Sequence, residues 1–396
     1  MAEVLREPDK PGGLSGDKAK DIFDWADVVF AQPSSELWAS ALLISARNHS
    51  GKKLVVDLDD HIWAVHPMNV GDVNGEVTYI RNAFSDKPED IWEPRKIKSS
   101  EVEGYAKRLD GFVACDGREH FFIRQKRPPV LLATESLLKE ADAITTTNEF
   151  LAEEIKRRTG NQNVFTVPNC LDLRQWNYEK PRHEEVWIGW CGSVSHYPDL
   201  EPLMPVFDEL MREYPQLRMQ IMGSSFDYLF PVKRDAKRTP IRGYTGDESL
   251  YAADYRECGE RWPGRMRFDK PVPIQQYVPW MLGNWQSDIG ICPILENDFN
   301  AAKSELKWVE YSALGVPTVA SKCGPYRRTI RHDVDGKLCS SKGAWRNGLS
   351  ELIEQPGRRR ELAGEARLRI EREYDARKCA PKWLDVFEYV LEAVAA

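Results

Sequence analysis

The sequence predicts an α/β protein in which helices cover parallel β-sheets. The main observation is that short apolar segments of strand length alternate with segments of helix length through much of the chain. The second observation is composition, because 42% of the 396 residues are hydrophobic and 10% are aromatic, which is ample for packed cores. A chain of this length typically forms two or three domains.

Charge and cysteine content exclude several classes of protein. The net charge is −7, so no overall basic field draws the chain to nucleic acid, although a local groove could still do so. No apolar run reaches the length of a membrane span, and the first residues are too polar for a secretory signal. The 8 cysteines lack metal-ligand spacing, and we expect them to be reduced and mostly buried, without disulfides. These observations favour a cytoplasmic protein.

The first half of the chain alternates strands with helices. Strands are expected over 26–31, 53–58, 142–145 and 163–167, and helices over 35–48, 131–141 and 147–158. Between residues 69 and 127 the sequence is charged and weakly periodic. There we expect a long excursion with one helix over 99–109 and a strand over 111–115, which would shape a binding site at the sheet edge.

Acidic residues stand at the end of the second predicted strand, in the sequence LVVDLDDH. Asp57, Asp59, Asp60 and His61 would lie at the carboxyl edge of the sheet, where open α/β sheets bind ligands. Such carboxylates could hold Mg²⁺ or Mn²⁺, supply the nucleophile of a phosphohydrolase, line an acceptor pocket or cap the next segment. The residues alone leave these alternatives open.

The second half of the chain repeats the alternation and ends in helices. Strands are expected over 186–193, 217–222, 287–293 and 318–320, and helices over 200–214, 274–282 and 305–314. A polar insertion occupies 224–264. The remaining residues are predicted to be helical, with breaks near Pro356 and Ala376 and a final helix over 383–394.

A glycine-rich turn follows the first strand of this half. The strand runs into Gly189-Trp190-Cys191-Gly192-Ser193, where small residues would let backbone N–H groups approach an anion. The pattern alone is a weak indication of a phosphate-binding site.

The segment FNAAKSELKWVEYSALGVPTVAS, residues 299–321, is the most informative part of the chain. Ser304 can cap the helix over 305–314, and Gly315 can end it in the left-handed conformation. On that helix, Lys303, Lys307 and Glu310 follow the i, i+4, i+7 spacing of a single face.

This helix face could bind a nucleoside diphosphate. A helix N-terminus attracts anions, two lysines would add positive charge, and Glu310 would lie about 10 Å further along, roughly the distance from a pyrophosphate to a ribose. The alternative for this spacing alone is a solvated face with Lys–Glu pairs. The sequence around the helix favours the binding function.

The segment KSELKWVEYSALGVPTVAS resembles the donor-binding segment of retaining GT-B glycosyltransferases of the family-4 type. ADAITTTNEFLAEEI and VFTVPNCLDLRQW are similar to the end of the first GT-B domain and its hinge. The resemblance implies two Rossmann-like domains with a cleft between them and a C-terminal helix that crosses back to the first domain. The implied boundaries are 1–168 for the first domain, 169–185 for a linker, 186–380 for the nucleotide-sugar-binding domain and 381–396 for the crossing helix.

The resemblance also implies roles for individual residues. Lys307 would meet the donor diphosphate, and Glu310 would bind the nucleoside ribose. The other donor-side positions that it implies are Gly192, Ser193, Phe299, Asn300, Lys303 and Ser304. The chain departs from the family at Ala302, where many relatives have a second Glu, and after Gly192, where Ser193 and His196 stand in place of an Arg and a Lys.

Together these features predict an enzyme that transfers a sugar from a nucleotide-sugar donor, with retention and without a metal or other cofactor. Lys303, Lys307, Asp60 and His61 are the predicted catalytic residues. The acceptor stays open among glycans, proteins, small molecules and modified nucleic acid bases. The alternatives are a metal-dependent transferase or phosphohydrolase built on the DLDD motif, and a nucleotide-sugar-binding protein without catalysis.

Overall fold

The computed structural model describes residues 21, 23–33, 37–64, 77–79, 111–115, 121–125, 129–179, 181, 183–192, 196–223 and 262–392. The chain forms two compact units. Unit 1 comprises residues 1–167 and 382–396, and unit 2 comprises residues 168–381. The predicted helix over 99–109 and most of the insertion over 224–264 lie outside the described residues.

Unit 2 is built on a parallel sheet of six strands in the order β10-β9-β8-β11-β12-β13. The strands are β8 (Val186–Gly192), β9 (Leu217–Gly223), β10 (Met266–Asp269), β11 (Ile289–Cys292), β12 (Thr318–Ser321) and β13 (Lys337–Cys339). The chain moves outward from β8 to β10, then returns to the other side of β8 with β11. This is the strand order of a doubly wound fold, and its switch point lies between β8 and β11.

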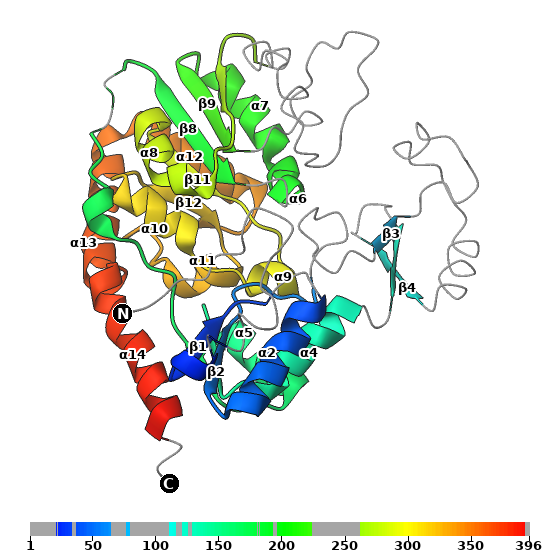
Figure 1. Cartoon of the computed structure of the whole chain (residues 1–396). Helices are drawn as coiled ribbons and strands as arrows, with labels where there is room; N and C mark the ends of the chain where they lie inside the picture. The colour runs from blue at the N-terminus through cyan, green and yellow to red at the C-terminus, as the bar shows by residue number, and fades with distance from the viewer. Residues whose placement is uncertain are drawn as a thin grey trace. The chain divides into compact units, whose positions relative to one another are not determined.

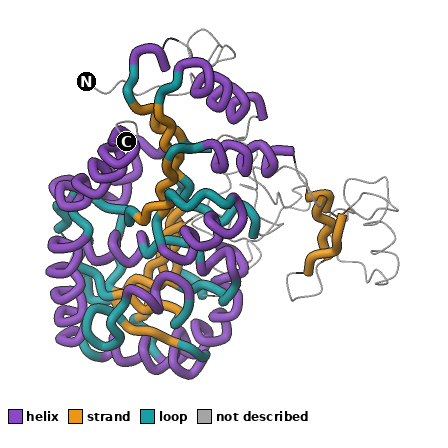
Figure 2. Tube along the Cα trace, turned by 90° about the horizontal axis from the view of Figure 1, so that it is seen from below, coloured by secondary structure: helices purple, strands orange, loops and turns teal. Residues whose placement is uncertain are grey.

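Helices cover both faces of this sheet, as Figures 1 and 2 show. Consecutive strand residues alternate between two cores, so that Trp190 packs on one face and Cys191 on the other. The first core contains side chains of α7 (Met204–Glu213) and α12 (Lys342–Glu354). The second contains side chains of α8 (Tyr277–Asn284), α10 (Leu306–Ala313) and α11 (Gly324–Thr329). Helix α13 (Pro356–Glu373) contributes to both cores.

Unit 1 contains a smaller parallel sheet of four strands in the order β1-β2-β6-β7. Its strands are β1 (Val28–Ala31), β2 (Lys53–Asp57), β6 (Ala143–Thr146) and β7 (Val164–Thr166), and its helices include α2 (Leu37–Ser50), α4 (Pro129–Glu140) and α5 (Glu149–Thr159). The bounds of these elements lie within two residues of the predicted ones. An antiparallel sheet of β3 (Val77–Tyr79), β5 (Phe121–Gln125) and β4 (Gly111–Cys115) lies within the excursion.

The last helix of the chain belongs partly to unit 1. Helix α14 (Ala376–Glu392) begins in unit 2, and from Lys382 onward it is part of unit 1. Val386 and Val390 of α14 form one apolar cluster with Val55 of β2 and Ala143 of β6. Phe30 of β1 stacks edge-on against Trp383, with ring centroids 5.2 Å apart.

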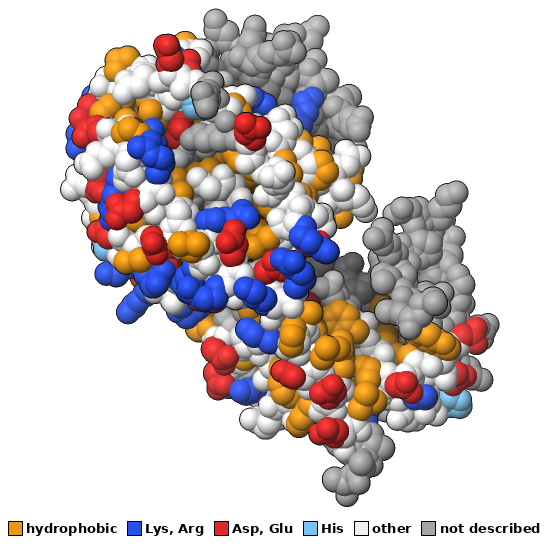
Figure 3. Space-filling model, turned by 90° about the vertical axis from the view of Figure 1, so that its left-hand side faces the viewer, with side chains coloured by type: hydrophobic (Ala, Val, Ile, Leu, Met, Phe, Trp, Pro, Cys, Tyr) orange, Lys and Arg blue, Asp and Glu red, His pale blue; other side chains and the backbone are white. Residues whose placement is uncertain are grey.

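Three partly buried arginines of α13 are neutralised by acidic residues of the same helix. The face of the molecule in Figure 3 shows groups of Lys and Arg side chains with Asp and Glu among them. Within α13, Arg358 pairs with Glu361, Arg367 with Glu371, and Arg369 with Glu373. Among the described residues, no helix is long and apolar enough to cross a bilayer.

The prediction that the cysteines form no disulfide is wrong for one pair. Cys170 and Cys379 form a disulfide, and they are 209 residues apart in the sequence. A parallel bridge between Leu171 and Asp375 brings the two segments together, supported by the hydrogen bonds from Leu171 N to Tyr374 O and from Ala376 N to Leu171 O. Cys191, Cys292, Cys323 and Cys339 are free and buried, as predicted. The disulfide removes one argument for a reducing compartment.

Candidate active site

The candidate site lies at the carboxyl ends of β8 and β11, at the switch point of the sheet in unit 2. Gly192 ends β8 and pairs in register with Gly223, the last residue of β9. Gly223 has φ +97°, and a Cβ on it would lie 2.3 Å from the Gly192 carbonyl oxygen. A Cβ on Gly192 would lie 2.6 Å from the Trp190 ring and 3.3 Å from Lys307 Cε. The glycines therefore let the two strand ends and the Lys307 side chain lie close together. Ser193, the next predicted site residue, lies outside the described residues.

The segment after β11 forms two helices, where the sequence indicates one. Helix α9 (Asp298–Ala301) is capped by Asn297, whose side chain accepts a hydrogen bond from Asn300 N. Helix α10 begins only at Leu306. The predicted single face of Lys303, Lys307 and Glu310 is therefore wrong, because Lys303 lies in the turn between the two helices. Only Lys307 and Glu310 share α10.

The predicted cap of α10 is also wrong. Glu305 occupies the N-cap position, and no side chain caps the helix. The Ser304 hydroxyl instead accepts a hydrogen bond from Asn169 Nδ2 at 3.0 Å. Gly315 ends α10 as predicted, with φ +67°. Its N–H donates to Ser312 O, and Val316 N donates to Tyr311 O, which satisfies the last carbonyls of the helix.

Glu310 is a buried carboxyl group on α10, with only 5% of its surface exposed. Its Oε2 accepts a hydrogen bond from the Tyr277 hydroxyl at 3.1 Å, and that hydroxyl lies 3.7 Å from Cys191 Sγ. Burial raises the pKa of Glu310 to about 7, although Lys307 and the Tyr277 hydrogen bond act in the opposite direction. A carboxyl group with this pKa beside a lysine is typical of functional sites.

Lys307 lies one helical turn before Glu310 and contacts a histidine. Its Nζ is 3.1 Å from His196 Nε2, and His196 Nδ1 is 2.8 Å from Asp199 Oδ2. His196 directly precedes the short helix α6 (Tyr197–Leu200), which follows β8. Burial lowers the pKa of His196 to about 4, and the charge of Lys307 acts in the same direction.

Phe299, Asn300 and Lys303 surround this cluster from α9 and its following turn. Asn300 Nδ2 donates to Asp199 Oδ1 at 3.1 Å and to Leu295 O at 2.9 Å. The Lys303 ammonium lies 4.3 Å from the centre of the Phe299 ring, in a cation–π contact. The structure thus brings Gly192, Lys307 and Asn300 into one connected cluster, with Lys303 in the turn after α9.

The predicted site residues of unit 1 follow β2. Asp57 accepts hydrogen bonds from Thr145 Oγ1 at 2.7 Å and Gln32 Nε2 at 3.0 Å, so it helps to join β2 to β6. Asp60 is exposed, whereas His61 is 2% exposed and its Nε2 lies 3.9 Å from Glu154 Oε2. Among the described residues, no three His, Cys, Asp or Glu side chains are grouped so that they could hold a metal ion.

Similarity to known proteins is found only at the level of structure. No protein-family model matches the sequence, and no curated protein matches it. HepE of Anabaena, solved with UDP and glucose, is 12% identical with a TM-score of 0.55, over 94% of this chain and 81% of that one. Sucrose-phosphate synthase of Thermosynechococcus elongatus is 12% identical with a TM-score of 0.54, over 96% of this chain and 77% of that one.

A glycosyltransferase of Rickettsia africae is 11% identical with a TM-score of 0.54, over 98% of this chain and 84% of that one. With their two parallel-sheet units, these proteins share one architecture with this chain. The fold is GT-B. This confirms the predicted fold class, and at these identities the likeness shows the fold alone.

Sequence reasoning missed two residues of the candidate site, Tyr277 and Asp199. Tyr277 contacts Glu310, and Asp199 anchors His196, yet neither was singled out. His196 was noticed only as the residue that replaces a cation. The signal for Asp199 was available, since a histidine and an aspartate three residues apart can meet on one helical turn. Nothing in the sequence links Tyr277 to α10.

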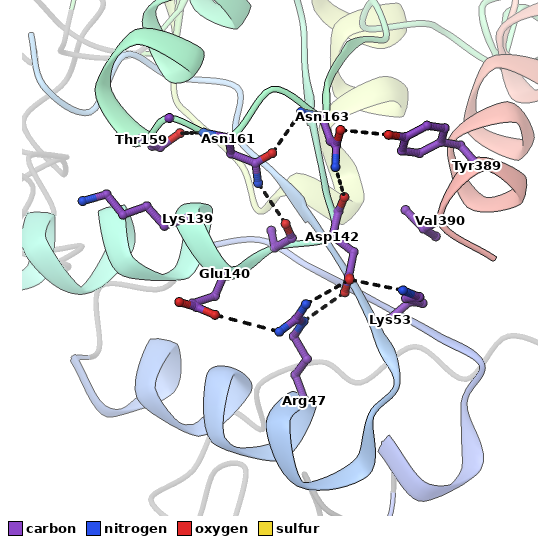
Figure 4. Close-up of a pocket in the computed structure, with 12 residues that line it drawn as sticks. Arg47, Lys53, Lys139, Glu140, Asp142, Thr159, Asn161, Asn163, Tyr389 and Val390 are labelled. Carbon is purple, nitrogen blue, oxygen red and sulfur yellow. Dashed lines mark hydrogen bonds and ion pairs between the residues drawn. The ribbon is translucent and has the colours of Figure 1, made fainter. Parts of the chain in front are cut away.

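A separate pocket of about 500 Å³ lies in unit 1 of the GT-B chain, at the amino ends of its strands (Figure 4). Its charged groups pair with one another, since Arg47 donates two hydrogen bonds to Asp142 and Lys53 lies 3.4 Å from the same carboxylate. Burial would raise the pKa of Asp142, but hydrogen bonds from Arg47 and Leu54 outweigh it and lower the pKa. The Tyr389 hydroxyl donates to Asn163 Oδ1 at 2.8 Å. We interpret this pocket as a structural feature, whose polar side chains connect α2, β6 and α14 through hydrogen bonds and ion pairs.

Proposed function

We propose that this chain is a glycosyltransferase that transfers a sugar from a nucleoside-diphosphate sugar to an acceptor hydroxyl or amine. The observation that carries the proposal is the pair of Lys307 and the buried Glu310, one helical turn apart on α10 at the switch point of the sheet. Dinucleotides and nucleotides bind at this place in doubly wound folds. HepE, a protein of the same fold, was solved with UDP and glucose.

In the proposed reaction, Lys307 stabilises the departing diphosphate. The bond between the sugar C1 and the diphosphate oxygen breaks, and its electron pair stays with the nucleoside diphosphate. The ammonium of Lys307 and the uncapped N-terminus of α10 stabilise this negative charge. Lys303 adds a second positive charge from the turn before α10.

The acceptor atom then bonds to C1, and its proton passes to the leaving phosphate oxygen. Because the leaving oxygen itself takes the proton, the acceptor attacks from the same face and the configuration at C1 is retained. The two lysines supply positive charge of the kind that a divalent cation supplies elsewhere, so we propose that no metal is required.

Glu310 is proposed to bind the ribose of the donor. Tyr277 occupies its Oε2, which leaves Oε1 to accept a hydrogen bond from a ribose hydroxyl. Phe299 and Asn300 are proposed to lie near the diphosphate and sugar, together with Gly192, Ser193 and Ser304. Asp60 and His61 of unit 1 are proposed to act on the acceptor side. The acceptor class stays open among glycans, proteins, small molecules and modified nucleic acid bases.

The decisive experiment measures sugar release from a panel of UDP-, GDP- and ADP-sugars by mass spectrometry. We expect hydrolysis of at least one donor, equal activity in excess EDTA, and a fall of about 100-fold in kcat for Lys307→Ala. The matched control is Lys342→Ala, because Lys342 is an exposed lysine at the start of α12.

Each result that differs from these expectations would support a different conclusion about the protein. If no donor is hydrolysed or bound, the proposed function is wrong. Activity that EDTA abolishes and Mn²⁺ or Mg²⁺ restores would favour the metal-dependent alternative. A Lys307→Ala protein that changes only KM would limit Lys307 to holding the donor.

A further inference from the structure

Asp199, His196 and Lys307 form a continuous hydrogen-bonded series of side chains, in which Asp199 and His196 are buried and Lys307 is half-buried. Asp199 Oδ2 lies 2.8 Å from His196 Nδ1, and His196 Nε2 lies 3.1 Å from Lys307 Nζ. Asp199 is 4% exposed and His196 is 6% exposed. The chain thus reaches from the loop after β8 to the first turn of α10, across 111 residues of sequence.

The carboxylate of Asp199 is fixed from several sides. Its Oδ1 accepts hydrogen bonds from Leu295 N at 2.8 Å and from Asn300 Nδ2 at 3.1 Å. Asn300 is in turn held by Leu295 O. A carboxylate held by the backbone of one loop and the side chain of the next helix gives His196 a single orientation.

The partners of His196 determine which of its nitrogens carries the proton. A carboxylate can only accept a hydrogen bond, and an ammonium group can only donate one. His196 must therefore donate from Nδ1 to Asp199 and accept at Nε2 from Lys307. This requires a neutral imidazole, in agreement with the lowered pKa of His196, for which burial is the main cause, followed by the charge of Lys307.

We propose that His196 is a positioning residue for Lys307. Its Nε2 accepts one hydrogen bond from the ammonium group and holds that group beside Gly192, which leaves the other two N–H groups of the ammonium to donate to the donor diphosphate. Gly192 takes part because its missing Cβ leaves room for the Lys307 side chain, whose Cε would lie 3.3 Å from such a Cβ. This inference rests on the proposed function, since it assigns a diphosphate to Lys307.

The first test needs no nucleotide. Nitrogen-15 NMR of the imidazole groups distinguishes a protonated Nδ1 from a protonated Nε2, and the protein has only 7 histidines. The His196 signals are assigned by their loss in His196→Phe. We expect a neutral ring with the proton on Nδ1 at pH 7. A proton on Nε2, or on both nitrogens, would overturn the proposal.

The second test is a double-mutant cycle on UDP binding, measured by calorimetry for the wild type, His196→Phe, Lys307→Ala and the double variant. We expect His196→Phe to weaken UDP binding about tenfold in the wild type and less than about twofold beside Lys307→Ala. An equal loss in both backgrounds would overturn the role of His196 and leave the proposed function intact. A wild type that binds none of UDP, GDP and ADP would overturn the proposed function as well.

Two amide variants separate positioning from folding. His196→Asn can keep the hydrogen bond to Asp199 but cannot reach Lys307, whereas His196→Gln can place an acceptor close to the position of Nε2. We expect Gln to retain more UDP affinity than Asn, at equal thermal stability. Equal affinities for the two variants would contradict a positioning role.

Discussion

At the scale of single residues, Glu310 carries a cost to stability that its proposed role explains. Because burial raises its pKa to about 7 from the model-peptide value of 4.5, the folded state binds more protons than the unfolded state between these values. The stability of the folded state therefore falls as the pH rises through this window, and the full penalty is present above pH 7.

We predict that Glu310→Gln stabilises the protein without ligand at pH 8 and weakens donor binding. The neutral amide avoids the buried charge, so the free energy of unfolding should rise by roughly 1–3 kcal/mol at pH 8, with little change at pH 4.5. Loss of the charged acceptor should weaken UDP binding by about 1–3 kcal/mol. Urea unfolding at the two pH values and calorimetry measure these effects.

Glu354→Gln is the control for this prediction. Glu354 also accepts a hydrogen bond from a tyrosine hydroxyl, that of Tyr214, but it is exposed. Its replacement should leave both the free energy of unfolding and UDP affinity close to those of the wild type. If Glu310→Gln behaves like Glu354→Gln in both measurements, Glu310 is not the ribose ligand.

The sequence could predict contacts between residues that are close together in the chain, but not contacts between residues that are far apart in it. Lys307 and Glu310 could be singled out because they are three residues apart on one helix. His196 and Lys307 are 111 residues apart, and Tyr277 and Glu310 are 33 apart. Their contacts depend on the strand order β8-β11, which local periodicity does not contain.

At the scale of elements, the end of α10 depends on the left-handed conformation of Gly315. A Cβ at this position would meet no atom within 4 Å, so the cost of a side chain would come from the backbone alone. We predict that Gly315→Ala lowers the free energy of unfolding by about 1–2 kcal/mol. Denaturant unfolding measures the change.

Gly364→Ala is the matched control. Gly364 lies in the interior of α13, is exposed, and a Cβ there would also meet no atom within 4 Å. Alanine should stabilise this helix by about 0.5–1 kcal/mol, because it loses less conformational entropy on folding. Stabilisation by both substitutions would show that Gly315 does not need its positive φ.

The segment before α10 shows which local structure the sequence did not predict. The predicted helix over 305–314 lies within one residue of the bounds of α10, but no helix was expected where α9 lies. In the structure Asn297 caps a separate short helix, and Glu305 begins the next one. Glu305 is held there by the Tyr374 hydroxyl, 2.7 Å from its Oε1, which is a tertiary contact.

At the scale of the whole molecule, the Cys170–Cys379 disulfide ties the two ends of unit 2 together. The bond closes a loop of 209 residues that contains the whole sheet of this unit. We predict that Cys170→Ser with Cys379→Ser lowers the free energy of unfolding of unit 2 by about 2–4 kcal/mol. Urea unfolding with and without reductant measures the change.

The double serine variant serves as its own control for the reductant. Reductant should shift the unfolding midpoint of the wild type towards that of the variant and leave the variant unchanged. An unfolding midpoint that reductant does not alter in the wild type would mean that the disulfide contributes no stability.

The fold class could be predicted because a parallel sheet covered by helices produces a repeated alternation of strand and helix segments in the sequence. The disulfide could not, because its two cysteines meet through the Leu171–Asp375 bridge between distant segments. The likeness of the 303–321 segment to a family motif favoured a nucleoside diphosphate over a solvated Lys–Glu face, two interpretations that the spacing alone left open.

The position of α14 at the end of the described chain has a consequence for the order in which the two units can fold during synthesis on the ribosome. Val386 and Val390 complete the apolar cluster around Val55 and Ala143, although these two pairs are separated by more than two hundred residues of unit 2. During translation, the sheet of unit 1 emerges first but lacks this cover until the α14 segment has been made. Unit 2 is continuous in sequence and can finish folding before that. The sheet of unit 1, which is synthesised before unit 2, is thus completed after it, and a ribosome that stalls before α14 would leave Val55 and Ala143 without their partners.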